Sequence, residues 1–311
     1  MKKIIAIIAV ILPMVVSAQQ EGMINQIAFN KLTINPGYTG YRERGIINIA
    51  HRQQWTGFKG APMTSLISFD TPLSTKEFAV GGAFINNKIG PVSKMELASY
   101  FSYRLKLNNK STISWGLSAG AQLYQVNLTD LQSYSDIVGV QDDALLTNTK
   151  GYFTPNFGFG VFYSNNDYYA GVSIPKLLSI QSVSKDNAPM QNFKQNSFRT
   201  IYLNGGYLHK ISSDMLLTYN LAMLSSINSP LTLGAYATCI LQKNYTFGAY
   251  YYVAQSAGLM FQMQMENQFS FGYALEFATN SLFRTNYGTH ELSLKYALNS
   301  KVKRITSAKY F

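Results

Sequence analysis

Few side chains in this sequence have the types and the spacing that catalysis or metal binding requires. The three histidines, His51, His209 and His290, form neither an HExxH motif nor a two-histidine metal pair. Asp142-Asp143 could bind a hard cation, but no further ligands follow at a suitable spacing, so a solvated loop pair is the simpler interpretation. A lipid hydrolase would need a serine paired with a histidine, and no such pair is evident. We therefore predict no catalytic residue, no metal site and no cofactor, and hence no enzyme.

The single cysteine, Cys239, has no partner for an intrachain disulfide. Its surroundings, LTLGAYATCI, are typical of a strand. A thiol nucleophile would need a base beside it, so we expect Cys239 to be a small packed or lipid-facing residue.

The composition is unusual for a soluble domain. Charged residues make up 13% and aromatic residues 14% of the chain, with 22 Tyr and 19 Phe, whereas a soluble domain carries about 25% charged residues. Beyond the N-terminus, no apolar run reaches the ~18 residues that a membrane-spanning helix needs. This combination favours a transmembrane β-barrel, in which every second residue faces lipid and aromatic residues form interfacial girdles. The alternative, a soluble secreted β-sandwich or propeller, would carry more charge on its outer face.

The N-terminus is typical of a secretory signal peptide. Lys2 and Lys3 precede an apolar stretch over residues 4–16, and Val16-Ser17-Ala18 places slim residues at a cleavage site. We predict cleavage after Ala18. A membrane anchor is the alternative, but the stretch is shorter than the ~20 residues that a spanning helix needs. The net charge of +11 indicates anionic lipid or protein partners, because export argues against nucleic acid.

Alternation of apolar and polar residues recurs along the chain. Residues 94–107 are the clearest case, since Met95, Leu97, Phe101 and Leu105 alternate with polar residues such as Glu96 and Arg104. Such segments predict fourteen strands, an even number that suits a closed barrel. The predicted strands begin near Gly45, Thr64, Phe78, Lys94, Ser111, Tyr152, Asp167, Phe198, Met215, Ser229, Tyr245, Gly258, Gln268 and Thr289.

These segments divide the chain into four parts. We predict a signal peptide over residues 1–18, an N-terminal segment over 19–44, an antiparallel transmembrane β-barrel over 45–298 and a basic tail over 299–311. The N-terminal segment lacks strand character and is either a plug inside the barrel or a periplasmic segment. Two long connections, near residues 128–150 and 175–197, contrast with tight turns at Asn108-Asn109 and Asn165-Asn166. In outer-membrane barrels, short turns are periplasmic and long loops extracellular.

One block of residues resembles a known family. It comprises Asn35-Pro36-Gly37-Tyr38-Thr39-Gly40, then Arg52-Gln53-Gln54-Trp55-Thr56-Gly57-Phe58, then Gly60-Ala61-Pro62-Met63-Thr64. This pattern is similar to the signature of the PorP/SprF family, which comprises outer-membrane proteins of the type IX secretion system in the Bacteroidota, some of them linked to gliding motility. Gly37 departs from the alanine that is at least as common there, but a small residue is kept.

The resemblance implies a non-enzymatic outer-membrane component that exports or anchors large cargo, such as an adhesin, with a C-terminal sorting domain. Its implied partners are periplasmic ring components or peptidoglycan-linked lipoproteins, secreted cargo and membrane lipid, with no nucleic acid. A channel for small solutes is the alternative function.

The block itself admits two interpretations. Arg52 can donate in a planar fork to carboxylates, and Trp55 can anchor at the membrane interface or stack on a partner. The block is then either a recognition patch at the barrel mouth or a structural motif that pins the N-terminal segment to the wall. The candidate residues are Asn35, Pro36, Tyr38, Arg52, Gln53, Gln54, Trp55, Gly57, Gly60 and Pro62.

Overall fold

A computed structural model describes residues 30–73, 77–127, 151–177, 199–226, 229–265 and 268–298. The predicted signal peptide, residues 19–29 of the N-terminal segment and the basic tail lie outside these ranges. So do Asp142-Asp143 and most of the two long connections.

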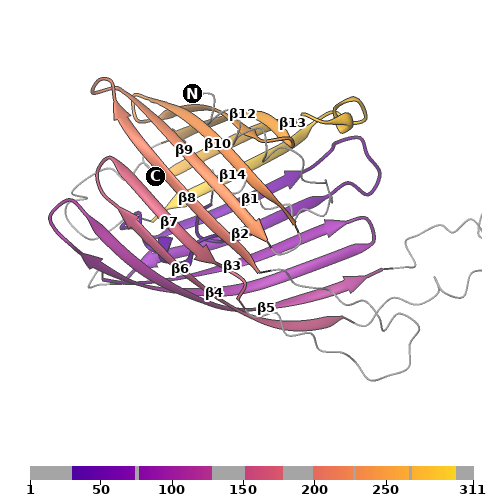
Figure 1. Cartoon of the computed structure of the whole chain (residues 1–311), viewed down its shortest axis with the longest axis horizontal. Coiled ribbons are helices and arrows are strands. Elements are labelled where there is room, and N and C mark those ends of the chain that lie inside the picture. Colours follow the sequence, from indigo (N-terminus) through magenta and orange to yellow (C-terminus); the bar gives the residue numbers. More distant parts are fainter. Residues whose placement is uncertain are drawn as a thin grey trace, which may run out of the picture.

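Fourteen antiparallel strands form a closed barrel in which each strand pairs with its neighbours in the chain and β1 pairs with β14 (Figure 1). The predicted barrel is thereby confirmed, and each strand begins within about two residues of its predicted start. The strands are β1 (Ile46–Gln53), β2 (Met63–Pro72), β3 (Phe78–Ile89), β4 (Val92–Lys106), β5 (Thr112–Val126), β6 (Tyr152–Ser164), β7 (Tyr168–Ile174), β8 (Thr200–Lys210), β9 (Met215–Ser226), β10 (Ser229–Leu241), β11 (Tyr245–Tyr252), β12 (Ser256–Met265), β13 (Phe269–Ala278) and β14 (Thr289–Ala297).

The sequence alternation sets which face of each strand is inside. On β4, Leu97 is 63% exposed on the outside, whereas Tyr100 is 5% exposed on the inside. Strand side chains point alternately to opposite faces, so one apolar set surrounds the barrel while polar and tyrosine side chains point into the lumen. The described residues contain no helix long and apolar enough to cross a membrane.

Exposed aromatic residues gather near the short-turn ends of the strands. Tyr103 stacks against Trp115 with ring centroids 6.3 Å apart, and Phe78 lies 5.1 Å from Tyr103. Further members are Tyr168, Tyr207, Tyr245 and Phe269. Such a row is typical of an aromatic girdle at a membrane–water interface.

The connections divide cleanly between the two ends of the barrel. Both long connections, β5–β6 and β7–β8, follow odd-numbered strands and leave one end, whereas the turns β4–β5 and β6–β7 lie at the other end (Figure 1). β1 begins and β14 ends at the short-turn end, because these strands run in opposite directions. This arrangement matches the expected division into short turns and long loops.

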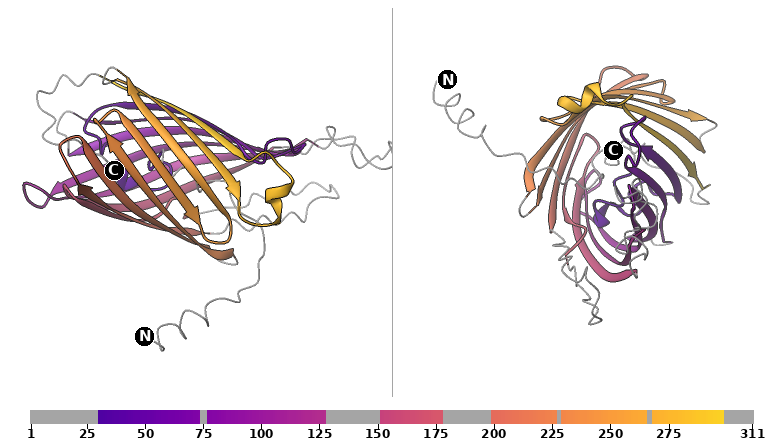
Figure 2. Two further views of the ribbon diagram at one scale, coloured as in Figure 1. Left: turned by 90° about the horizontal axis from the view of Figure 1, so that it is seen from above. Right: turned by 90° about the vertical axis from the view of Figure 1, so that its right-hand side faces the viewer.

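Residues 30–44 lie inside the barrel, where the sequence had left a plug and a periplasmic segment as alternatives. Every residue from Asn30 to Tyr41 is buried, and the 3-10 helix η1 (Pro36–Tyr38) contacts β4, β5, β6 and β7. The right-hand view of Figure 2 looks along the barrel, with the indigo N-terminal chain inside the ring of strands. We call residues 30–44 the plug.

Candidate functional site

The first block of the family-like motif builds the central turn of the plug. The Asn35 side chain caps η1 by accepting a hydrogen bond from the Gly37 N–H at 2.8 Å, and Pro36 occupies a first-turn position that suits proline. The amide Nδ2 of Asn35 donates to the backbone carbonyl of Val161 on β6 at 3.0 Å. One side chain thus both shapes the turn and attaches it to the wall.

Three wall strands carry glycine where they face this turn. A Cβ atom added to Gly116 on β5, Gly160 on β6 or Gly171 on β7 would collide with atoms of the Asn35–Gly37 turn. A neighbouring hydroxyl completes the seat, since the Ser114 Oγ donates to the Gly37 carbonyl at 2.6 Å. Glycine in a strand allows another backbone to approach closely, and here the turn of the plug fills the space that side chains would occupy.

Two apolar side chains of the plug pack against facing walls. Leu32 joins a buried cluster from β1 to β4 that contains Ala50, Leu66, Ala83, Ile85, Ala98 and Tyr100. Ile34 joins a cluster from β8 to β13 that contains Tyr202, Ala222, Leu224, Tyr236, Tyr250, Tyr252, Met260 and Ala274. With the glycine seat on β5 to β7, these clusters bring the plug against the wall from β1 to β13.

Aromatic side chains of the wall contact Lys31, Tyr38 and Tyr41 of the plug. Tyr38 and Tyr41 pack edge-on against Phe162, with ring centroids 5.3 and 5.2 Å away. The Lys31 ammonium lies 4.1 Å from the centroid of the Tyr169 ring. Burial, with Arg42 and Lys295 nearby, holds the pKa of Lys31 well below its usual range. The plug therefore includes a cation whose charge is costly to keep buried.

Within the plug, the chain turns at Gly40, where φ is +69° and glycine is favoured. The Gly40 N–H donates to Asp70 Oδ2 on β2 at 2.8 Å, and the Ser102 hydroxyl on β4 donates to the Thr39 carbonyl at 2.9 Å. Both bonds join the plug to the wall at β2 and β4, so together with the bonds to β5 and β6 they tether the plug along one half of the ring.

Arg52, the candidate carboxylate ligand of the second block, forms two ion pairs across the barrel seam. Its Nη2 lies 3.2 Å from Glu276 Oε1 on β13, and its Nη1 lies 3.4 Å from Glu291 Oε2 on β14. The Tyr250 hydroxyl donates to Glu276 Oε2 at 3.2 Å. Arg52 is 4% exposed, so its charge is paired inside the lumen, by carboxylates of the wall and not of the plug.

The rest of the second and third blocks forms the β1–β2 loop at the long-loop end. The Gln54 N–H donates to the Pro62 carbonyl at 2.9 Å, and the Gln53 side chain reaches the Gln54 carbonyl at 3.4 Å. Trp55 adopts a positive φ of 44°, and Gly57 and Gly60 adopt 93° and 77°. The motif therefore separates in space: Asn35, Pro36 and Tyr38 lie in the plug, and Arg52 to Pro62 lie in the wall and loop. Its role in partner binding stays a prediction.

Other charged residues on inward-facing strand positions are also buried. Glu96 on β4 forms an ion pair with Lys176, which follows β7, at 2.9 Å. Arg104, Glu276, Glu291 and Lys295 are each less than 9% exposed. Lys106, by contrast, is exposed at the end of β4. The lumen thus carries paired charges of both signs.

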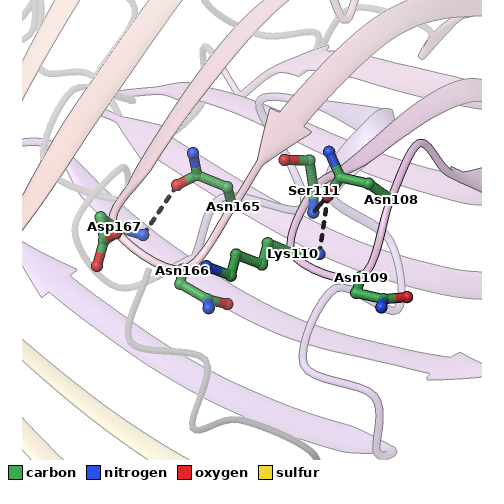
Figure 3. A pocket seen from close by; sticks show the side chains of 7 residues that line it. All are labelled: Asn108, Asn109, Lys110, Ser111, Asn165, Asn166 and Asp167. Atoms are coloured by element: carbon green, nitrogen blue, oxygen red, sulfur yellow. Dashed lines mark hydrogen bonds between the residues drawn. The ribbon is translucent and has the colours of Figure 1, made fainter.

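A hollow of about 390 Å³ lies between two tight turns at the opposite end of the barrel (Figure 3). The turns share one construction: Asn108 Oδ1 accepts from the N–H groups of Lys110 and Ser111, and Asn165 Oδ1 accepts from those of Asp167 and Tyr168. Asp167 is paired with Lys210 at 3.2 Å. The hollow offers amide hydrogen bonds but no pair of groups suited to catalysis. Its lining residues are Asn108, Asn109, Lys110, Ser111, Asn165, Asn166 and Asp167.

One pattern was missed in the sequence: residues 116–120, GLSAG, match the GxSxG motif of serine hydrolases. In those enzymes the serine sits on a sharp turn between a strand and a helix, whereas Ser118 lies within β5 and faces the lumen. His51, His209 and His290 lie on outward-facing strand positions, so none is placed as its base. Among the described residues, no group of three His, Cys, Asp or Glu side chains is arranged to hold a metal ion.

An apolar exterior, an aromatic girdle and a closed antiparallel sheet define this molecule as an outer-membrane β-barrel with a plugged lumen. The family described as type IX secretion system membrane protein PorP/SprF matches residues 16–296. The chain belongs to the PorP/SprF family, and its place is the outer membrane.

Solved structures similar to this chain are also membrane barrels. A TodX monoaromatic hydrocarbon channel mutant aligns with a TM-score of 0.53 at 9% identity, covering 87% of this chain and 94% of that one. The CymD monoaromatic hydrocarbon channel aligns with a TM-score of 0.51 at 9% identity, covering 87% and 93%. At such low identity these likenesses show the fold alone. No curated protein matches the sequence.

Proposed function

We propose that this chain is a non-enzymatic component of the type IX secretion apparatus that docks other proteins. It would engage periplasmic machine components at its short-turn end, or anchor large exported cargo with a C-terminal sorting domain at its long-loop end. A role in gliding motility, through an adhesin cargo, belongs to the same proposal. The supporting observation is the apolar layer around Leu32 and Ile34, because a barrel filled by its own chain is suited to docking and not to conduction.

A channel for small solutes is the second candidate, because a closed barrel is also the fold of the hydrocarbon channels among the structural neighbours. Conduction would require the plug to leave its seat. That seat combines the Asn35–Val161 and Ser114–Gly37 hydrogen bonds with two apolar clusters. The number and spread of these contacts argue against spontaneous opening, so docking is the better supported function.

Two measurements separate the candidates. Affinity purification of the full chain from gently solubilised membranes should retain ring components, peptidoglycan-linked lipoproteins or an exported protein with a sorting domain. The purified protein in planar bilayers should show no sustained conductance. Steady single-channel steps without partners, together with no retained secretion component, would replace docking with transport. A neighbouring gene for a large repeat adhesin or for a ring component would add support.

A further inference from the structure

Two loops at the long-loop end join above the seam between β1 and β14. The Thr56 N–H donates to the Gly288 carbonyl at 2.8 Å, and the Tyr287 N–H donates to the Thr56 carbonyl at 2.9 Å. The Trp55 N–H also donates to the Thr289 hydroxyl at 3.3 Å. We call residues 54–62 and 279–288 the seam platform; Figure 1 shows its two loops beside each other. Backbone pairing makes it a fixed surface.

The seam platform exposes large aromatic side chains. Phe58, Phe283 and Tyr287 are 55%, 57% and 78% exposed. The Tyr287 ring lies against Gly57, where an added Cβ would come within 2.6 Å of it. Phe283, on the short helix η4 (Ser281–Arg284), makes an edge contact with Phe277 at 6.0 Å. Clustered exposed apolar side chains commonly mark an interaction surface.

Above β1 and β14, this aromatic surface lies beyond the apolar belt of the barrel. Along the outer face of β1, apolar Ile47 and Ile49 are followed by His51 and Gln53 before the loop begins. On the outer face of β14, His290 likewise lies between apolar Leu292 and the loop. His51 is hydrogen-bonded to Ser65 at 3.0 Å, and His290 to Tyr273 at 2.7 Å. A polar row thus separates the lipid-facing residues of β1 and β14 from the platform, whereas on β13 the apolar outer face continues through Phe277 to Phe283.

The charge of this region has one sign. Lys59 and Arg284 are exposed on the seam platform, and Lys88 is exposed on β3 beside it, where the Gly90 N–H donates to the Gly60 carbonyl at 2.9 Å. The platform sequences contain no Asp or Glu. Exposed aromatic side chains with cations on the same loops complement a protein face that combines apolar side chains with carboxylates.

We propose that the seam platform is the docking surface for an acidic, partly apolar face of exported cargo. This inference rests on the proposed docking function and adds to it the surface and the charge of the partner. Phe58, Phe283 and Tyr287 supply the apolar contact, and Lys59 and Arg284 orient the partner.

Site-specific photo-crosslinking tests this surface in the full chain. Phe58 or Phe283 is replaced, one at a time, by p-benzoylphenylalanine in cells that export cargo, and adducts are identified by mass spectrometry. Leu221, 68% exposed on the belt, takes the same label as a control. The two platform positions should yield an exported protein with a sorting domain, and Leu221 only lipid.

Charge reversal supplies the second arm. Lys59→Glu with Arg284→Glu should reduce the protein adduct by about tenfold or more, because like charges across an interface are costly. The heat-modifiable band of a folded barrel should be unchanged. Adducts with lipid alone, or a protein adduct that survives charge reversal, would overturn the proposal. If the wild-type chain retains cargo on purification in that case, the docking function stands and only its location is wrong; if it retains none, both fail.

Discussion

Arg52 on the first strand and Glu291 on the last strand form an ion pair across the seam where the barrel closes, with Arg52 Nη1 3.4 Å from Glu291 Oε2. Glu276 on β13 holds the same guanidinium at 3.2 Å. All three side chains face the lumen, where the two carboxylates share one guanidinium.

Replacing Arg52 by alanine should destabilise the barrel strongly. Two carboxylates would remain buried without their cation, and losing one partner of a buried pair costs about 3–5 kcal/mol. The urea midpoint of the protein in detergent should fall accordingly. Arg52→Met combined with Glu276→Gln and Glu291→Gln should recover most of the loss, because the guanidinium and both of its carboxylate partners are then removed together.

The exposed pair Lys210–Asp167 is the matched control for Arg52. Its side chains are 56% and 54% exposed, and pairs of this kind contribute at most about 1 kcal/mol. Lys210→Ala should therefore leave the midpoint nearly unchanged. Equal effects of Arg52→Ala and Lys210→Ala would contradict the assigned role of Arg52.

Leu221→Arg should impair membrane assembly, whereas Ile211→Arg in the same hairpin should be tolerated. Leu221 lies in the middle of β9 and is 68% exposed on the outer face, while Ile211 lies in the turn after β8. An arginine costs about 2–4 kcal/mol at the bilayer midplane and about 0–1 near an interface. Urea unfolding in lipid vesicles measures the difference. Equal tolerance at both positions would mean that Leu221 does not face hydrocarbon.

The barrel could be predicted from the sequence because a strand's alternation is local. The apolar and polar faces of residues 94–107 are visible within a dozen residues, and β4 follows them. The same logic placed the hairpin turns at Asn108 and Asn165. Alternation over fourteen strands suits a wall whose two faces meet different environments.

The contacts of the motif could not be predicted, because they join distant segments. Arg52 meets Glu276 and Glu291 at sequence separations of 224 and 239 residues, which only closure of the barrel brings together. Likewise, nothing in the sequence around Pro36 indicates that this turn packs against glycines of β5 to β7. Sequence marked the motif residues as special, and the structure divides them between the plug and the loop.

Lys31→Met should stabilise the folded protein at neutral pH. Burial lowers the pKa of Lys31, so between that value and its usual one of about 10.4 the folded state binds fewer protons than the unfolded chain. The stability of the wild-type protein therefore rises with pH through this window. Below the window, the full cost of burying the protonated Lys31 applies. Melting of the heat-modifiable form at pH 7 and pH 10.5 should show a gain for Lys31→Met that shrinks at the higher pH.

Lys210→Met, at an exposed position, is the control for Lys31 and should show no such pH-dependent gain. If Lys31→Met is instead less stable than the wild-type protein at pH 7, the favourable contacts of the ammonium exceed the cost of burying it. The contact of the ammonium with the Tyr169 ring, at 4.1 Å, would then outweigh the cost of burial.

Gly116→Val should release the plug while leaving the barrel wall intact. Valine suits a strand, but any Cβ at this position would collide with the Pro36–Gly37 backbone, so the turn must move off β5. Planar bilayers should then record conductance that the wild-type protein lacks. Gly82→Ala on β3 is the matched control, since its Cβ would meet nothing nearer than the Ala98 carbonyl at 3.6 Å. A silent Gly116→Val variant that folds normally would show that residues 30–44 are not the barrier in the lumen.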